Sequence, residues 1–486
     1  MLTLLLIIIP LVFTIVLFAL PDSKYVKSVA LIGGIVEFVF SLYVLFQYQY
    51  GCHCVLNYHS QFFQQLGISF SLNIDGLSLL MILLTSFLSP LIIYSAFTKQ
   101  SNKPPAFYAL ILLMETAFIG VFTATDVLWF YVFWDLALIP ICFLTAVWGG
   151  KNKRVITVEF LIYTLVGSLL MLIAIIYLYT LTPGMHSFSF SSYYNLTLDY
   201  KTQVWVCLAF FMAFAIKVPL FPFHSWLPKT HTASPTQGSM FLAGIMLKMG
   251  IYGLLRFIIP LCPLALGSWT FYAVVLSVVG ILYSSIIAIK QTELKRLIAF
   301  SSLGHMGLIA AGVFSLTFNG IEGGILQVIS HGINVAGMFF CYDIIYRRTK
   351  TGTIASIGGI ASKAPIFSVF FMIILLANIA LPLTNGFVGE FLLLMGIFEY
   401  NAYLSAIAGL TIIFGAIYML WMYQRIMYGE TTEATQDFPE ITLQESLVLT
   451  PLVIMIFWIG IYPKMFLHIA EPYVRDLLEV LTYKLK

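Results

Sequence analysis

The sequence predicts an all-α, polytopic membrane protein, and three observations carry that prediction. Of its 486 residues, 60% are apolar and only 9% are charged, whereas about 25% of residues are charged in an average soluble domain. The mean hydropathy is +0.98. The apolar runs are continuous and reach the roughly 20 residues that a helix needs to cross a bilayer, without the alternating polarity of a transmembrane β-strand. This composition excludes a water-soluble enzyme, a disordered chain and a nucleic-acid-binding protein.

The apolar runs indicate about 14 transmembrane helices. They fall at residues 2–20, 28–47, 74–96, 106–124, 127–148, 156–181, 203–222, 236–260, 268–289, 296–316, 322–346, 364–397, 403–428 and 445–466. Lys and Arg residues gather in the loops that follow odd-numbered helices, so the positive-inside rule places both termini on the outer side of the membrane. No soluble domain interrupts the chain, and its chemistry must therefore take place in or beside the bilayer.

Six titratable side chains within these helices are the main functional candidates, because an ionised group is costly in lipid and therefore indicates function. They come from six different helices and are Asp135, Lys217, Lys248, His305, His331 and Glu390. At about 1.5 Å of rise per residue, the positions outside the interrupted helices come out roughly 12–18 Å deep, near the middle of a ~30 Å hydrocarbon core. Such a set suits proton transfer, because an adjacent opposite charge can switch a buried lysine between holding and releasing a proton. Glu115 is a further candidate at similar depth.

Each of these side chains also has a purely structural interpretation. Asp135 and Lys217 could form a static buried ion pair, and His305 and His331 could be packed histidines that hydrogen-bond to the backbone. Glu390 could cap the second half of a broken helix. The common depth of the six groups favours proton transfer over these alternatives.

Two of the predicted helices are interrupted. Pro219 and Pro222 break the seventh helix just after Lys217, and the Pro382–Gly386 segment breaks the twelfth ahead of Glu390. Broken helices at corresponding positions of two halves are typical of transporter sites, although an ordinary proline kink is the alternative. We therefore expect two inverted five-helix repeats, with the chain divided into 1–105 (helices 1–3), 106–260 (helices 4–8), 261–428 (helices 9–13) and 429–486 (C-terminal loop and helix 14).

Four segments around these residues resemble a known family. They read AFAIKVPLFPFHSWLPKTH, ELKRLIAFSSLGHMG, QVISHGINVAGMFF and LPLTNGFVGEFLLLMG. They resemble the signature segments of the antiporter-like membrane subunits of proton-pumping NADH:quinone oxidoreductase, respiratory complex I, and within that family the subunit-M branch. The resemblance covers roughly residues 70–430. It implies a bacterial inner (plasma) membrane or, alternatively, an organelle inner membrane.

The resemblance also implies roles for the buried groups. The helix-5 acid, at Asp135, would modulate the proton affinity of Lys217; Lys248, His305 and His331 would relay the proton laterally; and Glu390 would pass it to the outer side. The family usually has glutamate at the helix-5 position, so the side chain of Asp135 is one methylene shorter for its pairing with Lys217.

The same family implies that electron carriers belong to other chains. Flavin, iron–sulfur clusters and quinone would lie on partner subunits, and the partners would be other membrane-arm subunits, including further antiporter-like ones. The sequence agrees in having no Gly-x-Gly-x-x-Gly loop after a strand, no phosphate-binding P-loop and no Cys-x-x-Cys pair among its six cysteines. Three alternatives stay open: a cation/proton antiporter subunit of the multi-subunit type, the related arm of a membrane-bound hydrogenase, and a passive structural subunit.

Overall fold

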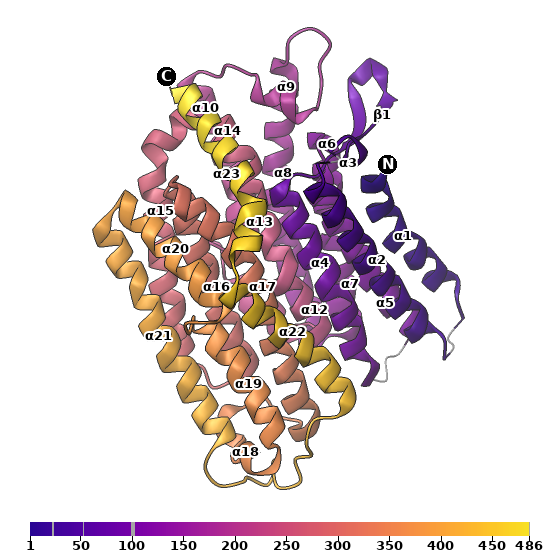
Figure 1. The fold of residues 1–486 in the computed structure, drawn as a ribbon, viewed down its shortest axis with the longest axis vertical. Helices are drawn as coiled ribbons and strands as arrows, with labels where there is room; N and C mark the ends of the chain where they lie inside the picture. The colour runs from indigo at the N-terminus through magenta and orange to yellow at the C-terminus, as the bar shows by residue number, and fades with distance from the viewer. Residues whose placement is uncertain (22–23, 52, 99–102, 486) are drawn as a thin grey trace. The chain divides into compact units, whose positions relative to one another are not determined.

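The computed structural model describes residues 1–21, 24–51, 53–98 and 103–485 of the chain (Figure 1). Contacts divide it into two compact units. Unit 1 comprises Met1–Val218, Ile245–Trp269 and Glu471–Lys486, and unit 2 comprises Pro219–Gly244 and Thr270–Ala470. The border after Val218 coincides with the predicted break in helix 7. The four-part division and the inverted repeats proposed from the sequence stay a prediction.

Unit 1 contains the N-terminal helices and the helices around Asp135, Lys217 and Lys248. In it α1 packs against α5, α2 against α4, and α8 against α10. Its elements are α1 (Leu2–Ala19), α2 (Val26–Gln49), α3 (His53–Leu56), β1 (Tyr58–Phe63), η1 (Gln64–Leu66), β2 (Ile68–Leu72), α4 (Gly76–Ser95), η2 (Ala96–Thr98), α5 (Pro104–Thr123), α6 (Val127–Leu136), α7 (Leu138–Trp148), α8 (Lys153–Leu181), α9 (Phe190–Tyr194), α10 (Tyr200–Lys217), α13 (Leu247–Gly253), the π-helical turn η4 (Leu254–Ile258) and α14 (Ile259–Leu261).

Unit 2 is built around the long helix α17, which packs against α16, α19, α20 and α22. Two helices, α15 and α23, and the π-helical turn η3 (Leu242–Met246) have residues in both units. The elements of unit 2 and these two helices are α11 (Trp226–Ala233), α12 (Thr236–Phe241), α15 (Pro263–Ile289), α16 (Leu294–Phe314), α17 (Phe318–Thr349), η5 (Ile354–Ser356), α18 (Ile360–Lys363), α19 (Pro365–Asn378), α20 (Asn385–Tyr400), α21 (Ala402–Met427), α22 (Leu443–Ile461) and α23 (Lys464–Leu485).

The predicted membrane-spanning character is confirmed. Within the described residues, 12 helices are long and apolar enough to cross a membrane. The other two runs of the expected 14 correspond to α10, which begins with a polar turn and ends in a lysine, and to the α19–α20 pair, whose halves are each too short. The count of 14 crossings is consistent with this arrangement and stays a prediction.

Side-chain caps fix where several of these helices begin. The Asp75 carboxylate accepts a hydrogen bond from the Ser78 amide at the start of α4, and Asp126 accepts from the Leu128 and Trp129 amides at the start of α6. These bonds satisfy amide groups that have no partner inside the helix. Both polar caps hold their helix ends at one end of unit 1.

Both predicted helix breaks are present, and there is a third. The helix ends at Lys217 before the two prolines, and α19 ends at Asn378 with α20 beginning at Asn385. The third break separates α6 from α7 at Ala137, two residues after Asp135. It arises because Pro140 has no N–H group to offer to the carbonyl four residues earlier.

The predicted helical membrane fold is confirmed, and the structure adds one short hairpin that the sequence analysis did not predict. The segment between α2 and α4 forms an antiparallel hairpin, in which Tyr58 pairs with Leu72 and Ser60 with Phe70. Its polar and aromatic residues occur in a short alternating pattern, which a search for long apolar runs does not detect. The hairpin and α9 lie at the same end of unit 1 as the N-terminus, whose ammonium donates to the carbonyl of Val55 at 3.3 Å (Figure 1).

Candidate proton-transfer site

The break in helix 7 places Lys217 at the carboxyl end of α10. With Pro219 and Pro222 next in the chain, the last carbonyls of the helix lose their partners, and the helix dipole favours a cation there. The Lys217 side chain is buried, with 2% of the residue exposed, and its ammonium lies 4.8 Å from the centre of the Trp134 ring. The prolines that end the helix therefore also place the buried ammonium of Lys217 at the helix end.

Asp135 comes directly after Trp134 on α6 but does not pair directly with Lys217. Its carboxylate accepts hydrogen bonds from Ser168 Oγ, at 3.4 Å, and from the Tyr131 hydroxyl. In the part of the chain that the structure describes, no salt bridge joins Asp135 to Lys217. The static ion pair considered from the sequence is therefore absent. A short aspartate arm leaves an electrostatic interaction across space instead of a direct contact.

Lys248 is fully buried on α13, and a glycine of that helix lets it approach α10. A Cβ atom at Gly250 would lie 2.5 Å from a methyl group of Val218, so a larger residue would push the two segments apart. The π-helical turns η3 and η4 flank α13 on both sides. Such turns are frequent at functional sites. Unit 1 therefore brings the helix of Lys248 to the end of the helix that carries Lys217.

Unit 2 brings the other three predicted residues together. His305 on α16, His331 on α17 and Glu390 on α20 are all buried. The Nδ1 atom of His305 lies 3.0 Å from Oε1 of Glu390, and the rings of His305 and His331 have their centres 5.5 Å apart. Two imidazoles and a carboxylate from three helices thus lie close together in the interior, and all three can hold a proton.

A polar residue that the sequence analysis missed completes this group. Gln327 Nε2 donates to Glu390 Oε1 at 3.4 Å. Gln327 precedes His331 by four residues on α17, and this i, i+4 spacing on one helix face is the signal that could have identified it. Gly389 permits the contact, because a Cβ atom there would clash with the Gln327 side chain. The carboxylate is therefore held between an imidazole and an amide.

Polar side chains from α16, α19 and α21 extend the polar region around Glu390. Ser301 Oγ accepts from Tyr418 at 3.3 Å and from Asn378 at 3.4 Å, and all three side chains are buried. Asn378 is the last residue of α19, directly before the predicted break. At the break, the amide of Asn378 therefore lies next to the hydroxyl groups of Ser301 and Tyr418.

Glu115 does not contact the Asp135–Lys217 region of unit 1 through a hydrogen bond or an ion pair among the described residues. It is fully buried on α5. Its role stays a prediction. In the same part of the chain, no cluster of three or more His, Cys, Asp or Glu side chains could hold a metal ion.

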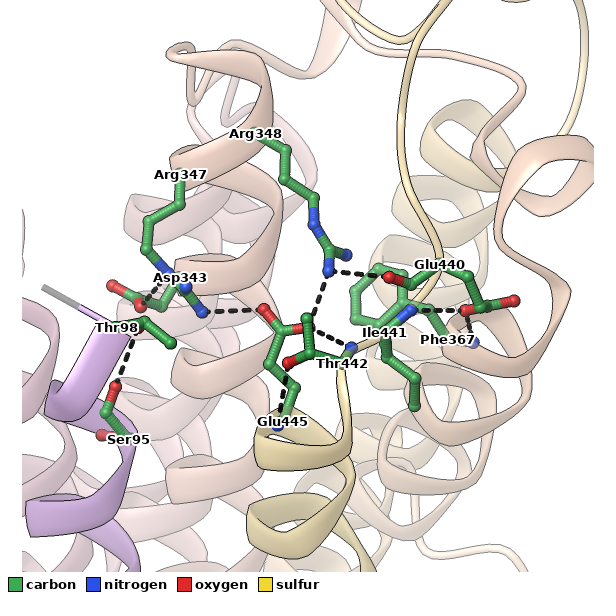
Figure 2. A network of polar contacts seen from close by, with 10 residues as sticks. All are labelled: Ser95, Thr98, Asp343, Arg347, Arg348, Phe367, Glu440, Ile441, Thr442 and Glu445. Atoms are coloured by element: carbon green, nitrogen blue, oxygen red, sulfur yellow. Dashed lines mark hydrogen bonds and ion pairs between the residues drawn. The ribbon is translucent and has the colours of Figure 1, made fainter.

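A second charged network in unit 2 is structural in character (Figure 2). Glu445, 3% exposed at its side chain, lies 3.0 Å from Arg347 Nη2 and 2.6 Å from Arg348 Nη2, while Asp343 binds Arg347 at 2.8 Å. Glu445 also forms a capping box with Thr442 at the start of α22. Every charge has an opposite partner, so this network fixes the end of α17 to the start of α22.

Comparison with known proteins identifies the family of the chain. The family model described as NADH:quinone oxidoreductase/Mrp antiporter, TM, matches residues 124–415. The NADH-quinone oxidoreductase subunit M of Rickettsia conorii is 38% identical over 463 residues, which is 93% of this chain and 92% of that protein. The chain belongs to this family. The resemblance drawn from the four sequence segments is thereby confirmed.

Relatives within the family extend to organelles and to solved structures. The NADH-ubiquinone oxidoreductase chain 4 of Marchantia polymorpha is 35% identical over 486 residues, covering 98% of this chain and 96% of that one. A chain of respiratory complex I from Thermus thermophilus with bound NADH has a TM-score of 0.91 and 30% identity over 99% of this chain and 100% of its own. The chain is thus an antiporter-like subunit of the subunit-M type.

The fold is shared more widely than the sequence. A chain of the Mrp complex from Dietzia sp. has a TM-score of 0.87 at 19% identity, covering 99% of this chain and 98% of its own. At that identity the likeness concerns the fold alone.

Proposed function

We propose that the chain translocates protons across the membrane as a subunit of a proton-pumping NADH:quinone oxidoreductase. The observation that carries the proposal is the buried group in unit 2, where a histidine nitrogen lies 3.0 Å from a carboxylate oxygen and a second imidazole follows 5.5 Å away. A row of protonatable groups inside an apolar environment has little structural value. It can, however, transfer protons from one helix to the next.

In unit 1 the moving charge would be the ammonium of Lys217. Trp134 and the helix end stabilise the protonated form of Lys217, and the nearby Asp135 carboxylate adds to that stabilisation. Because Asp135 is hydrogen-bonded to Ser168 and Tyr131 instead of Lys217, a small shift of α6 at its break would change the distance between the two charges. At an effective dielectric of 20, a change from 4 to 7 Å alters their interaction by about 2 kcal/mol.

The energy for transfer would come from other chains of the assembly. The relatives bear the name NADH-quinone oxidoreductase, and the chain with the TM-score of 0.91 comes from a respiratory complex I structure with bound NADH. We propose that flavin, iron–sulfur clusters and quinone belong to partner subunits. Lys248, His305 and His331 would relay protons laterally, Glu390 would release them to the outer side, and both termini would face that side.

The test compares two glutamates of α20 in the assembled complex. Glu390→Gln removes the buried acid, and Glu399→Gln removes an exposed one nine residues later on the same helix. In reconstituted vesicles supplied with NADH and quinone, Glu390→Gln should lower the number of protons moved per electron, whereas Glu399→Gln should not.

A Lys217→Ala variant, with the exposed Lys201→Ala on α10 as its control, should give the same contrast in unit 1. An unchanged proton-to-electron ratio in both Glu390→Gln and Lys217→Ala would refute the proposed function and favour a passive structural role.

The rival function is that of a cation/proton antiporter subunit, since the family model includes Mrp antiporters. Identity of 30% with the chain of respiratory complex I, against 19% with the chain of the Mrp complex, supports the oxidoreductase. Purification from the native membrane separates them. Co-isolation with flavin and iron–sulfur subunits supports the oxidoreductase, whereas sodium-dependent proton exchange without those subunits supports the antiporter. A hydrogenase arm would co-isolate with a subunit that oxidises hydrogen.

A further inference from the structure

Unit 1 contains a cavity with many polar side chains in its wall, and none of the candidate proton-transfer residues lines it. Its volume is about 670 Å³, and residues of the β1–β2 hairpin, the start of α4, α9 and the end of α13 line it. Hydroxyl, imidazole, carboxylate and guanidinium groups are all present in its wall. At about 30 Å³ per molecule, such a space has room for on the order of twenty waters, and polar walls are what buried water requires. We refer to it as the vestibule.

The hairpin and α9, which line the vestibule, lie at the end of unit 1 that holds the N-terminus (Figure 1). The positive-inside rule places that end on the outer side. The loop charges in the sequence therefore indicate on which side of the membrane the cavity lies, which the structure alone does not show.

An ion pair between Arg256 and Asp75 lies in the wall of the vestibule. Arg256 Nη2 lies 2.5 Å from Asp75 Oδ1 and 3.0 Å from Ser78 Oγ, and that hydroxyl lies 3.2 Å from the Tyr252 hydroxyl. The Arg256 guanidinium also stacks on two rings, 5.0 Å from Tyr252 and 4.7 Å from Tyr473. Its Nε atom is buried without a hydrogen-bond partner among the described residues. The arginine is thus held in place while it retains one donor for a water molecule.

Tyr252 connects this ion pair to the buried lysine. It lies on α13 four residues after Lys248, so the two side chains share one helix face about 5–6 Å apart at their Cβ atoms. Tyr252 lines the vestibule while only 2% of it is exposed, and its hydroxyl donates to the carbonyl of Phe122 at 3.1 Å. One helical turn therefore separates a group in the vestibule wall from Lys248.

We propose that the vestibule is an outer proton port of unit 1, through which Lys248 exchanges protons with the outer side, and that the Arg256–Asp75 pair is its gate. The inference rests on the proposed role of Lys248 as a proton relay. In the closed state, the guanidinium repels a hydrated proton in the vestibule. In the open state, Arg256 leaves Ser78, and a proton passes from Lys248 to water through the hydroxyl of Tyr252. That hydroxyl takes up one proton and releases another, so only N–H and O–H bonds change.

The port is distinct from the release at Glu390, which lies in unit 2. A chain with two ports could release protons at both, or load at one and release at the other. The two possibilities share the requirement that a gate prevents proton leak when no electrons flow, and that requirement makes the gate testable.

The test measures passive proton flux through the assembled complex in vesicles without NADH. Arg256→Gln should raise the leak at least fivefold over the wild-type complex, and the double variant Arg256→Gln/Lys248→Ala should return it to the wild-type level. Arg475→Gln, which removes an exposed arginine of α23 paired with Glu471, is the matched control and should not leak. An absence of leak in Arg256→Gln, or a leak that persists without Lys248, would overturn the proposal.

A second measurement does not depend on the folding of the arginine variant. Ser71 lies on β2 in the vestibule wall, and Ser89 is fully buried on α4. In a background with Cys52 and Cys54 replaced by serine, a membrane-impermeant thiol reagent added outside should modify Ser71→Cys and not Ser89→Cys. Modification of neither variant would overturn the outer port. Loss of pumping in Glu390→Gln together with either negative result would leave the proposed function standing and remove only the vestibule.

Discussion

Replacing Gly250 by alanine tests whether the close approach of α13 to α10 is needed for function. The added methyl group would lie 2.5 Å from Val218 Cγ2 and 3.0 Å from the Val218 backbone nitrogen. Carbon atoms in contact prefer roughly 3.5–4.0 Å, so α13 would have to move by about 1 Å. Overpacking of this kind typically costs about 1–3 kcal/mol. The same movement would carry Lys248 away from the end of α10.

The assay measures both stability and coupling. Gly250→Ala should lower the Tm of the assembled complex and reduce the number of protons moved per electron, while NADH oxidation in uncoupled vesicles stays near the wild-type rate. Gly267→Ala is the control, because a Cβ atom there meets nothing within 4 Å. Adding Val218→Ala should restore part of the loss, since it removes the methyl group but not the backbone contact. Wild-type stability and coupling in Gly250→Ala would refute the argument.

Two further predictions concern the charged and capping residues. Glu445→Gln should destabilise unit 2 by about 3 kcal/mol, at the lower end of the cost of breaking a buried pair, because Arg347 keeps Asp343 and Arg348 keeps a carbonyl; an unchanged Tm would contradict this. Burial raises the pKa of Asp126, outside the membrane spans, to about 6, so folding stability should fall as the pH rises from about 4 to 6. Asp126→Asn keeps the helix cap and should remove that decrease, measured as the Tm difference between pH 4 and pH 7; an equal difference in both proteins would show that Asp126 is not its source.

The membrane spans and the two main breaks could be read from the sequence for direct physical reasons. A continuous apolar run of 20 residues has few stable environments other than a bilayer, and a proline removes a backbone donor wherever it occurs. The identity of the buried titratable groups follows equally directly, because the cost of burying a charge depends on the residue type and its depth. These inferences need only local information.

The grouping of those residues could not be read in the same way. Helix rise gives the depth of a residue, but not the direction of its side chain around the helix axis relative to another helix. That His305 contacts Glu390, 85 positions later, depends on how α16, α17 and α20 pack. Gln327 was missed for the same reason. An amide among apolar residues indicates a functional site only when the structure shows that Glu390 lies beside it.

The sequence by itself determined that this protein spans a membrane, where two of its helices break and which groups can carry protons, because burial, backbone donors and ionisation are properties of individual residues. Tertiary packing decided which of those groups meet. It held Asp135 with Ser168 and Tyr131 instead of Lys217, brought Glu390 to His305, and placed Arg256 on Asp75, 181 positions earlier in the chain. Contacts at such separations arise from the joint packing of many helices, which no local pattern specifies.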